Sequence, residues 1–364
     1  MLTAEGCLER RKRLWDTLNP KPQMDHLRLG DPIHLVYFAN FFVDPFSLGR
    51  EFGGYLILRN DGEAKLIHDD RLPGSVEMAH VKDRQKVHWY DGHSPAKGPR
   101  QLALLEAVNP TQGGFRMHDR PGDPMAEQLV TTIAEMRRKK DPDEIAVLRK
   151  AIAAGEAGHK WARENLKPGM TELDVYLGVA AAAQKHVGQA AIVYGDFAVS
   201  PGPERRGGPP TDREIQSGDM MILDFSVVLH GYRGDFTNTY LIGKEPTADQ
   251  QRIFDLCVQA MAAGEPELKA GASCLTVYEA VRSVFEKEGV AEHFGHHAGH
   301  GLGLTHPEAP YFVPGANQLL VPGDVVTLEP GLYIQGIGGV RIEHNYLITQ
   351  DGFERLSNHT IALR

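Results

Sequence analysis

Two stretches of this chain place a carboxylate inside an otherwise apolar segment that has the composition of a β-strand. In MMILDFSVVL, residues 220–229, Asp224 follows Met, Ile and Leu, and in VVTLEPGLYI, residues 325–334, Glu329 follows Val, Val, Thr and Leu. An unpaired charge in a protein interior costs several kcal/mol or forces the group to take up a proton. The fold must therefore bring a compensating charge to each of these two acids.

A second acid follows each of the two segments at a spacing that suits a hairpin. Ten residues separate Asp224 from Asp235, and Glu329 and Glu343 are symmetric about Gly336. Antiparallel pairing can set such residues on neighbouring strands, where directly opposite side chains lie about 5 Å apart at Cβ and like charges repel. Two such pairs that converge on one place predict a cation site.

Arginine offers the alternative explanation, because a single acid in a strand is more often exposed to solvent or paired with an arginine. Arg233 and Arg341 lie close in sequence to the two pairs. This alternative explains one acid better than it explains four acids in two symmetric pairs with a histidine between them. Four carboxylates and one imidazole form an oxygen-rich set that suits Mn, Co, Fe or Zn. Two divalent ions bridged by water would neutralise the four charges and supply hydroxide near neutral pH.

The stretch HFGHHAGHGLGLTHPEAP, residues 293–310, carries five histidines threaded through glycines. The glycines disfavour a helix, so we expect an extended segment in which residues two and four apart share a face. His300 is then the predicted metal ligand, and His296 is its neighbour on the substrate side. We expect His293 and His297 to be surface or structural residues.

A change in sequence character near residue 137 predicts a domain boundary. The length of 364 residues suits about two domains. Residues 1–137 resemble a mixed α/β domain, with a hairpin predicted over residues 53–70 around an Asn-Asp-Gly turn. Beyond the boundary, Asp141 is followed by proline and, three residues on, by Glu144, which is a strong signal for the start of a helix. We therefore expect two domains, residues 1–137 and 138–364.

The same order of elements occurs twice within the second predicted domain. Each round has two helices followed by a hairpin that carries acids. We predict helices from residue 141 onward and over residues 171–188, 247–269 and 275–289, and strands over residues 220–229, 235–243, 325–334 and 340–349. This repetition suggests a duplicated α+β unit.

Composition and charge exclude several classes of protein. The net charge of −9 argues against a nucleic-acid partner, because such proteins need a basic surface. Three cysteines without a pairing rhythm suit reduced thiols in a cytoplasm. No window reaches the roughly 18 apolar residues needed to span a membrane, and the N-terminus lacks the apolar core of a signal peptide. We expect a cytoplasmic protein with neither a nucleic-acid nor a membrane partner.

The second predicted domain resembles the pita-bread metallopeptidases, the family of methionine aminopeptidase, aminopeptidase P, prolidase and creatinase. The motifs that carry the resemblance are DPDEIAVLRKA, KPGMTE, GDMMILDFS, GYRGDFTNT, GHGLGL, TLEPGLYI and GGVRIE. Residues 1–137 are similar in size and hairpin content to the creatinase-type domain of aminopeptidase P and prolidase. The resemblance implies an α+β protein with a duplicated pita-bread catalytic domain, a smaller creatinase-like α/β domain and a homodimeric assembly.

The resemblance also implies a set of metal ligands, and all five positions are filled in this chain. Asp224 would bind one metal through both of its oxygens, whereas Asp235 and Glu343 would bridge two metals. His300 and Glu329 would complete the coordination of the other metal, and Glu329 would also act as the general base. The implied cofactor is a pair of divalent ions, with manganese as the first choice and cobalt, zinc or iron as alternatives.

Residues beside the ligands match the family only in part. His296 would help to hold the substrate, and Arg341 would offset the charge of the acid cluster. Gly207 and Pro307 stand where family peptidases usually carry histidines. His306 lies one place before Pro307, and it would replace the missing histidine only if the chain bulges locally, because a shift of one residue in a strand reverses the side-chain face.

The sequence therefore predicts a dinuclear metallopeptidase that cleaves the bond before proline in small peptides, by attack of a metal-bound hydroxide. A hydrolase or lyase of a small non-peptide molecule on the same fold stays open, because two family histidines are absent. A catalytically inactive binding module is the third reading, although such proteins typically lose ligands. Arg205 and Arg206, beside Gly207, would either bind a substrate carboxylate or belong to a solvated loop.

Overall fold

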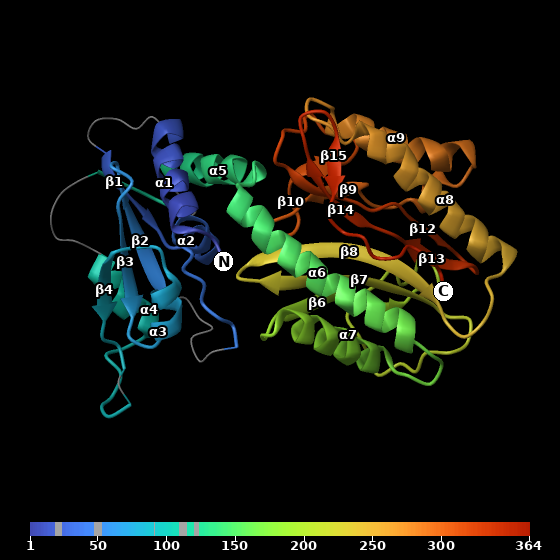
Figure 1. Ribbon diagram of the computed structural model, residues 1–364, viewed down its shortest axis with the longest axis horizontal. Helices are drawn as coiled ribbons and strands as arrows, with labels where there is room; N and C mark the ends of the chain where they lie inside the picture. The colour runs from blue at the N-terminus through green and yellow to red at the C-terminus, as the bar shows by residue number, and fades with distance from the viewer. Residues whose placement is uncertain (19–23, 47–52, 91, 109–114, 120–123) are drawn as a thin grey trace. The chain divides into compact units, whose positions relative to one another are not determined.

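The computed structural model describes residues 1–18, 24–46, 53–90, 92–108, 115–119 and 124–364 (Figure 1). The chain divides into two compact units, Met1–Arg137 and Arg138–Arg364. In the described part of the chain, no helix combines the length and the hydropathy that a membrane crossing requires.

The N-terminal unit contains a mixed five-stranded sheet with the strand order β4-β3-β2-β1-β5. Its strands β1 and β5 pair in parallel, as do β3 and β4, and the other pairs are antiparallel. The predicted hairpin over residues 53–70 is confirmed as β2 and β3, joined by a turn in which Gly62 adopts a φ of 82°. The elements are α1 (Ala4–Leu18), β1 (Met24–Leu29), α2 (Pro32–Ala39), β2 (Gly54–Arg59), β3 (Ala64–Asp69), α3 (Pro73–Met78), β4 (Asp83–Val87), α4 (Arg100–Val108), β5 (Phe115–His118) and α5 (Pro124–Arg138).

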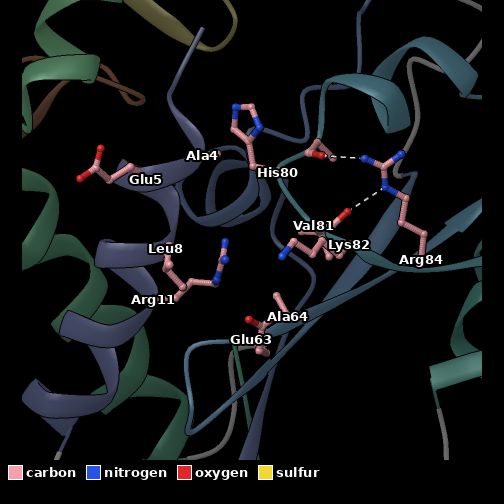
Figure 2. Close-up of a pocket in the computed structure, with 11 residues that line it drawn as sticks. Ala4, Glu5, Leu8, Arg11, Glu63, Ala64, His80, Val81, Lys82 and Arg84 are labelled. Carbon is pink, nitrogen blue, oxygen red and sulfur yellow. Dashed lines mark hydrogen bonds between the residues drawn. The ribbon is translucent and has the colours of Figure 1, made fainter.

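A cavity of about 630 Å³ lies in this unit beside α1 and the segment that precedes β4 (Figure 2). Two arginines line it, and both use their donors on backbone carbonyls. Arg11 donates to the carbonyls of Phe38 and Gly62, each at 2.8 Å. Arg84 donates to two carbonyls of the segment before its own strand, at 2.8 and 2.9 Å (dashed lines in Figure 2). These guanidinium groups therefore hold neighbouring segments of the unit together.

The second unit contains two rounds of paired helices and strands. The first round comprises α6 (Pro142–Asn165), α7 (Glu172–Val187), β6 (Ile192–Val199), β7 (Met220–Leu229) and β8 (Tyr232–Leu241). The second comprises α8 (Ala248–Gly264), η1 (Glu265–Glu267), α9 (Cys274–Lys287), η2 (Ala291–His293), β9 (Gly299–Gly301), β10 (Glu308–Phe312), β11 (Val325–Leu328), β12 (Gly331–Ile334), β13 (Gly338–Arg341), β14 (His344–Ile348) and β15 (Phe353–Arg355). Helix α6 packs across β7 and β8, whereas α8 packs against β12 and β13 (Figure 1).

Helix ends in this unit follow the local sequence signals. The N–H of Asp141 donates to Glu144 at 2.9 Å, which closes the predicted capping box of α6. Helix α7 is capped by Thr171 and ends at Gly188, as predicted. The predicted helix over residues 247–269 is too long, because α8 ends at Gly264 and a short 3-10 turn containing a proline follows. Proline has no N–H to continue the helical hydrogen bonds.

The two acid-bearing segments differ in regularity. Residues 220–229 form one continuous strand, β7, as predicted. The single strand predicted over residues 325–334 is wrong, because Pro330 interrupts the hydrogen-bond ladder and separates β11 from β12. The return strand predicted over residues 340–349 is likewise divided into β13 and β14. Pairing of Leu328 with His344 and of Gly331 with Arg341 continues one register across both breaks.

Candidate metal centre

The two halves of the second unit meet where the breaks in the strands lie. Strand β13 contacts both β7 and β8, and β14 contacts β8. Glu329 and Glu343 occupy the gaps between β11 and β12 and between β13 and β14, and the shared register sets them opposite each other. A backbone that leaves the ladder at these points is free to turn both side chains towards the first hairpin.

The first hairpin presents Asp224 and Asp235 on one face of the sheet. Asp224 pairs with Thr237, and Asp235 pairs with Ser226, so the two acids are diagonal neighbours on adjacent strands. The reason is the position of the turn, in which His230 and the following glycine both adopt positive φ. Diagonal placement increases the separation of the two charges compared with directly opposite residues.

The five predicted ligands gather at this junction. Oxygens of Asp224, Asp235 and Glu343 lie within 4.8 Å of one another, and so do ligand atoms of His300, Glu329 and Glu343. The Nε2 atom of His300 is 3.4 Å from Glu329 Oε1 and 3.8 Å from Asp235 Oδ2. All of them except Asp224 are 6% exposed or less. The structure therefore brings four carboxylates and one imidazole into a single buried cluster.

Hydrogen bonds fix the orientation of His300 within the cluster. Its Nδ1 atom lies 2.9 Å from the carbonyl of Gly301, which makes Nδ1 the donor. The other ring nitrogen, Nε2, is then an acceptor that faces Glu329 and Asp235. Such a carbonyl contact is the usual way in which a protein sets the tautomer of a metal-binding histidine.

Three hydroxyl groups hold the carboxylates, and the sequence analysis did not identify them. Each donates one hydrogen bond: Ser226 to Asp235 at 3.1 Å, Thr237 to Glu343 at 2.7 Å and Thr327 to Glu329 at 3.1 Å. Each hydroxyl also lies two residues from an acid in the same segment, and residues two apart in a strand share a face. That spacing is the signal that could have found them.

The charge of the cluster tests whether divalent ions fit it. Burial raises the pKa of Asp224 to about 7, against the opposing charge of Arg341. Burial, and then the charge of Asp235, raises the pKa of Glu343 well above its usual range. The Oε1 atom of Glu343 is buried and has no hydrogen-bond partner among the described residues. The protein thus supplies too little positive charge for four ionised acids, and this oxygen-rich donor set fits divalent cations.

Glu329 differs from Glu343 in its surroundings. Burial alone would raise the pKa of Glu329, but the adjacent imidazole of His297 and its charge hold this pKa below its ordinary value. The Nδ1 atom of His297 lies 3.3 Å from Glu329 Oε1. Glu329 is therefore suited to stay ionised and to accept a proton.

All three guanidinium nitrogens of Arg341 have hydrogen-bond or ion-pair partners. Its Nε donates to Asp224 Oδ2 at 2.8 Å, and its Nη2 lies 2.5 Å from Oδ2 of both Asp224 and Asp196. Its Nη1 donates to the hydroxyl of Tyr333 at 2.7 Å and to the carbonyl of Arg206 at 3.1 Å. The pKa of Arg341 lies well above its usual value, because Tyr333 and the facing acids outweigh burial. The guanidinium is committed to these partners.

Asp196 was not identified from the sequence, and neither was its strand, β6. Asp196 lies directly opposite Asp224 across the β6–β7 pair. Two facing carboxylates repel, and Arg341 bridges them. The segment Ile192–Val199 shows the same signal as the other acid-bearing strands, namely an acid within an apolar run. The signal was therefore present in the sequence.

The histidine stretch is less regular than predicted. Only Gly299–Gly301 forms a strand, so the alternation of faces does not extend back to His296 and His297. His297, expected to be a surface or structural residue, has a side chain that is 37% exposed, but it also contacts Glu329 and lines a cavity beside the acid cluster. His293 ends the 3-10 turn η2 and lies 3.6 Å from Glu292, outside the residues that line the cavity.

His296 takes part in a hydrogen-bonded series that ends at the acid cluster. Its Nδ1 lies 2.7 Å from the carbonyl of His297, and its Nε2 lies 3.2 Å from the hydroxyl of Tyr333. The same hydroxyl accepts from Arg341. Burial lowers the pKa of His296 to about 4, so its ring is neutral near pH 7. Tyr333 is the member of this series that the sequence analysis missed.

One cavity of about 280 Å³ collects these side chains. Four of the five predicted ligands line it, all except Glu343, and His296, His306 and Arg341 line it as well. Three acids of the cluster, Asp224, Asp235 and Glu329, therefore form part of the cavity wall. This arrangement can bind cations next to a small polar ligand.

Residues 146–350 match the sequence profile of metallopeptidase family M24. The chain is also 31% identical over 366 residues to an uncharacterized peptidase of Staphylococcus aureus (strain USA300), with 95% of this chain and 98% of the relative covered. The chain belongs to metallopeptidase family M24. The predicted family is thereby confirmed, and so is the prediction that the protein is a metallopeptidase.

Further similarities of this M24 metallopeptidase concern a second relative and a solved structure. It is 36% identical over 233 residues to a probable dipeptidase PepE of Mycobacterium bovis, with 62% of this chain and 60% of the relative covered. It is similar to the structure of the Xaa-Pro dipeptidase from Bacillus anthracis, with a TM-score of 0.77, 24% identity and 99% of each chain covered. The similarity to this solved structure confirms the predicted pita-bread fold with a smaller N-terminal domain. Membership of the family implies divalent metal ions as cofactors.

His306, the predicted substitute for one missing family histidine, lies beside the acid cluster of the metallopeptidase. The Nε2 atom of His306 lies 2.6 Å from Asp235 Oδ2, and the side chain lines the cavity. Residues 302–307 lie outside any strand, between β9 and β10. The alternation of faces that would have turned His306 away from the site does not apply there. The sequence analysis required the chain to leave the regular strand locally for His306 to face the site, and it does so here.

The position of the other missing histidine, residue 207, has no room for a side chain beside Asp196. Gly207 has a φ of 152°, and a Cβ at this position would collide with the carboxylate of Asp196. The next residue, Gly208, donates its N–H to the same carboxylate at 2.7 Å. Asp196 and its bond to Arg341 therefore occupy the space that a side chain at residue 207 would need.

A matched pair of alanine variants tests this conclusion. Both glycines have positive φ, but a Cβ at Gly208 meets no atom within 4 Å. Gly207→Ala is therefore expected to lower the free energy of unfolding by about 1–3 kcal/mol more than Gly208→Ala, through overpacking against Asp196. Unfolding in urea measures both values. Equal losses would show that backbone conformation alone selects glycine at residue 207.

Proposed function

We propose that this metallopeptidase cleaves the bond before proline in small peptides and uses two divalent ions. The observation that carries the proposal is the cluster of four carboxylates and one imidazole beside a small cavity, which all of them except Glu343 line. The substrate class is supported by the similarity to a protein named as an Xaa-Pro dipeptidase and to one named as a probable dipeptidase.

The proposed ligands divide into two overlapping sets. Asp224, Asp235 and Glu343 are close enough to share one ion, and His300, Glu329 and Glu343 are close enough to share another. Because Glu343 belongs to both groups, we propose it as a bridge, together with Asp235. Manganese is the first choice for this oxygen-rich set, with cobalt, zinc or iron as alternatives. When bound, such ions make water a nucleophile near neutral pH and polarise the scissile carbonyl.

Glu329 is proposed to move the proton during hydrolysis. Its carboxylate accepts a hydrogen bond from Thr327 at 3.1 Å and faces His297 at 3.3 Å, which fixes its direction. An ionised carboxylate in this position can take the proton of the attacking water and give it to the leaving amine. The leaving group is the ring nitrogen of proline. It departs as a secondary amine, which must be protonated in this way as the bond breaks.

His296 and His306 are proposed to hold the substrate from two sides. Each lines the cavity. His296 is held through both ring nitrogens, by the carbonyl of His297 and the hydroxyl of Tyr333, whereas His306 contacts Asp235 through Nε2. Arg341 keeps Tyr333 in place and offsets the charge of Asp224. These contacts support the roles that the sequence predicted for His296, His306 and Arg341.

We also propose the domain organisation, cellular location and assembly of the protein. Residues 1–137 would form a creatinase-like N-terminal domain, and residues 138–364 would form the catalytic domain. The protein would act as a cytoplasmic homodimer on small peptides, without a nucleic-acid or membrane partner. Similarity to a solved dipeptidase over 99% of both chains supports the two-domain proposal.

Turnover on defined peptides tests the proposed function. The protein, loaded with Mn²⁺ or Co²⁺, is mixed with a panel of Xaa-Pro dipeptides, Xaa-Pro-Xaa tripeptides and matched peptides that carry alanine in place of proline. Release of the first amino acid from the proline peptides is the expected result. If metal is demonstrably bound and none of the proline peptides is cleaved, the proposal is wrong.

A second candidate is favoured by one observation. Gly207 and Pro307 replace two histidines that family peptidases usually carry, which would suit a hydrolase or lyase of a small non-peptide molecule. The same panel decides between the two, because such an enzyme would leave every peptide intact. An inactive binding module is disfavoured, because all five ligand positions are filled and lie together.

Removal of the metal is expected to abolish activity and to lower stability. Without cations, the buried acids repel one another or take up protons. At a metal concentration of about 100 times Kd, binding adds about 2.7 kcal/mol to the free energy of unfolding. Thermal unfolding after chelation, and again after Mn²⁺ is restored, measures the change. The Glu343→Gln variant is the control and should lose most of the metal-dependent rise. An equal rise in the variant would contradict the assignment of Glu343.

A further inference from the structure

Arg206 places a positive charge on the wall of the catalytic cavity. Its guanidinium lies over the ring of Tyr333, 5.3 Å from the centroid, and its Nη1 donates to the carbonyl of Gly295 at 3.3 Å. Across the described residues, no carboxylate forms an ion pair with it. The residue is exposed and also lines the cavity, so its remaining donors are accessible to solvent. This cation is therefore available to a ligand.

The neighbouring arginines are not available. Arg205 uses Nη1 and Nη2 on the two oxygens of the buried Glu172, at 3.1 and 2.9 Å. Arg341 is committed to two acids and a tyrosine within the cluster. Of the two alternatives left open for Arg205, binding of a substrate carboxylate is disfavoured, because its guanidinium holds the loop to Glu172 of α7. Arg206 is left as the arginine that can.

The position of Arg206 is fixed from both ends. Its backbone carbonyl accepts a hydrogen bond from Arg341 at 3.1 Å. Its guanidinium fits against Gly295, where a Cβ would collide with Nη1. Because Gly295 precedes His296, the charge is held next to a residue that we propose to contact substrate. A cation that is positioned before binding loses less entropy when a ligand arrives.

We propose that Arg206 binds the C-terminal carboxylate of the substrate, so that the enzyme acts on dipeptides in preference to longer peptides. This inference rests on the proposed function, because it requires a peptide in the cavity. A guanidinium offers two parallel N–H donors that match a carboxylate. In a dipeptide the free carboxylate lies one residue beyond the scissile bond, whereas in a longer peptide a neutral amide occupies that place.

The size of the cavity agrees with this substrate class. At about 280 Å³ it lies at the lower limit of ligand pockets, which run from about 300 to 1,000 Å³. A peptide of two residues suits this space better than an extended one. With the acid cluster neutralised by metal ions, Arg206 would also give the wall of the cavity a positive charge that attracts an anionic terminus.

Paired substrates test the proposal. Ala-Pro and Ala-Ala are each assayed as the free acid and as the C-terminal amide, with the Mn²⁺-loaded enzyme. The wild type is expected to show at least a tenfold higher kcat/KM for the acid. Arg206→Gln should lower kcat/KM for the acid by about 10- to 100-fold, mainly through KM, and leave the amide within about twofold.

Three further variants sharpen the test. Arg206→Lys keeps the charge without the parallel donors, so it should retain part of the preference for the acid. Gly295→Ala moves the guanidinium of Arg206 without removing its charge. Like Arg206→Gln, it should lower the preference for the acid over the amide. Arg252→Gln removes an exposed arginine on α8 that is paired with Glu288, and it should change neither substrate.

These experiments judge the role of Arg206 separately from the proposed cleavage before proline. Cleavage of Ala-Ala but not Ala-Pro would reject the preference for proline, while the ratio of acid to amide would still judge Arg206. If neither dipeptide is cleaved, calorimetry measures the same ratio in binding. A wild type that treats acid and amide alike overturns the proposal. Equal losses on acid and amide in Arg206→Gln would also overturn it, because they would indicate a packing role against Tyr333.

Discussion

Glu329→Gln is expected to lower kcat on a cleavable peptide by on the order of 1,000-fold, which is the usual scale for the loss of a general acid–base group. Glutamine keeps the shape of the side chain and the hydrogen bond from Thr327, but it cannot accept the proton of the attacking water. Its contact with His297 would change as well, because a neutral amide would replace the carboxylate that faces the imidazole. Steady-state kinetics at saturating metal and substrate measures the loss.

A control and a second readout separate proton transfer from loss of metal. Glu354→Gln removes an exposed carboxylate that pairs with Arg149 on the surface, and it should leave kcat unchanged. Elemental analysis of Glu329→Gln reports how much metal is retained. A loss of less than tenfold, with full metal content, would remove Glu329 from the role of general base.

Arg341→Met should cause the largest loss of stability. Removal of one partner from a buried ion pair costs about 3–5 kcal/mol, because the other charge is left unpaired. Here two acids lose their partner, since Asp196 and Asp224 face each other across β6 and β7. At about 2–4 °C for each kcal/mol in a domain of this size, Tm should fall by roughly 6–20 °C. Activity should fall by about 10- to 100-fold or more, because Asp224 loses its support.

A double variant identifies the cause of that loss. Adding Asp196→Asn to Arg341→Met removes one of the two facing charges, so Tm should recover in part while activity stays low. Arg149→Met, which breaks an exposed ion pair, should change the free energy of unfolding by less than about 1 kcal/mol. If the double variant is no more stable than Arg341→Met, repulsion between Asp196 and Asp224 is not the cause.

The candidate ligands could be predicted because their signal is local. An acid within an apolar strand is costly wherever the strand is placed, so Asp224 and Glu329 stand out without any knowledge of the fold. The same holds for the helix caps, since the capping box of α6 and the glycine that ends α7 depend on a few neighbouring residues. These predictions concern interactions within short segments.

Predictions failed where a local rule was extended across an irregular segment. The alternation of faces set His297 apart from His300, but only three residues around His300 form a strand. His297 therefore reaches Glu329, and His306 reaches Asp235 from a segment without regular structure. Backbone that is bound neither in a helix nor in a ladder takes its direction from distant contacts, which periodicity does not describe.

The sequence by itself identified the candidate ligands: two acids inside apolar segments, a second acid after each of them, and a histidine among glycines. Only the tertiary structure decided which charge meets which. Arg341 bonds Asp224 from 117 residues away and Asp196 from 145 residues away, whereas Arg206 is left for a ligand. The physical reason is that strand composition and turns are set by neighbouring residues, while the partner of a buried charge is set by the register and packing of the whole core.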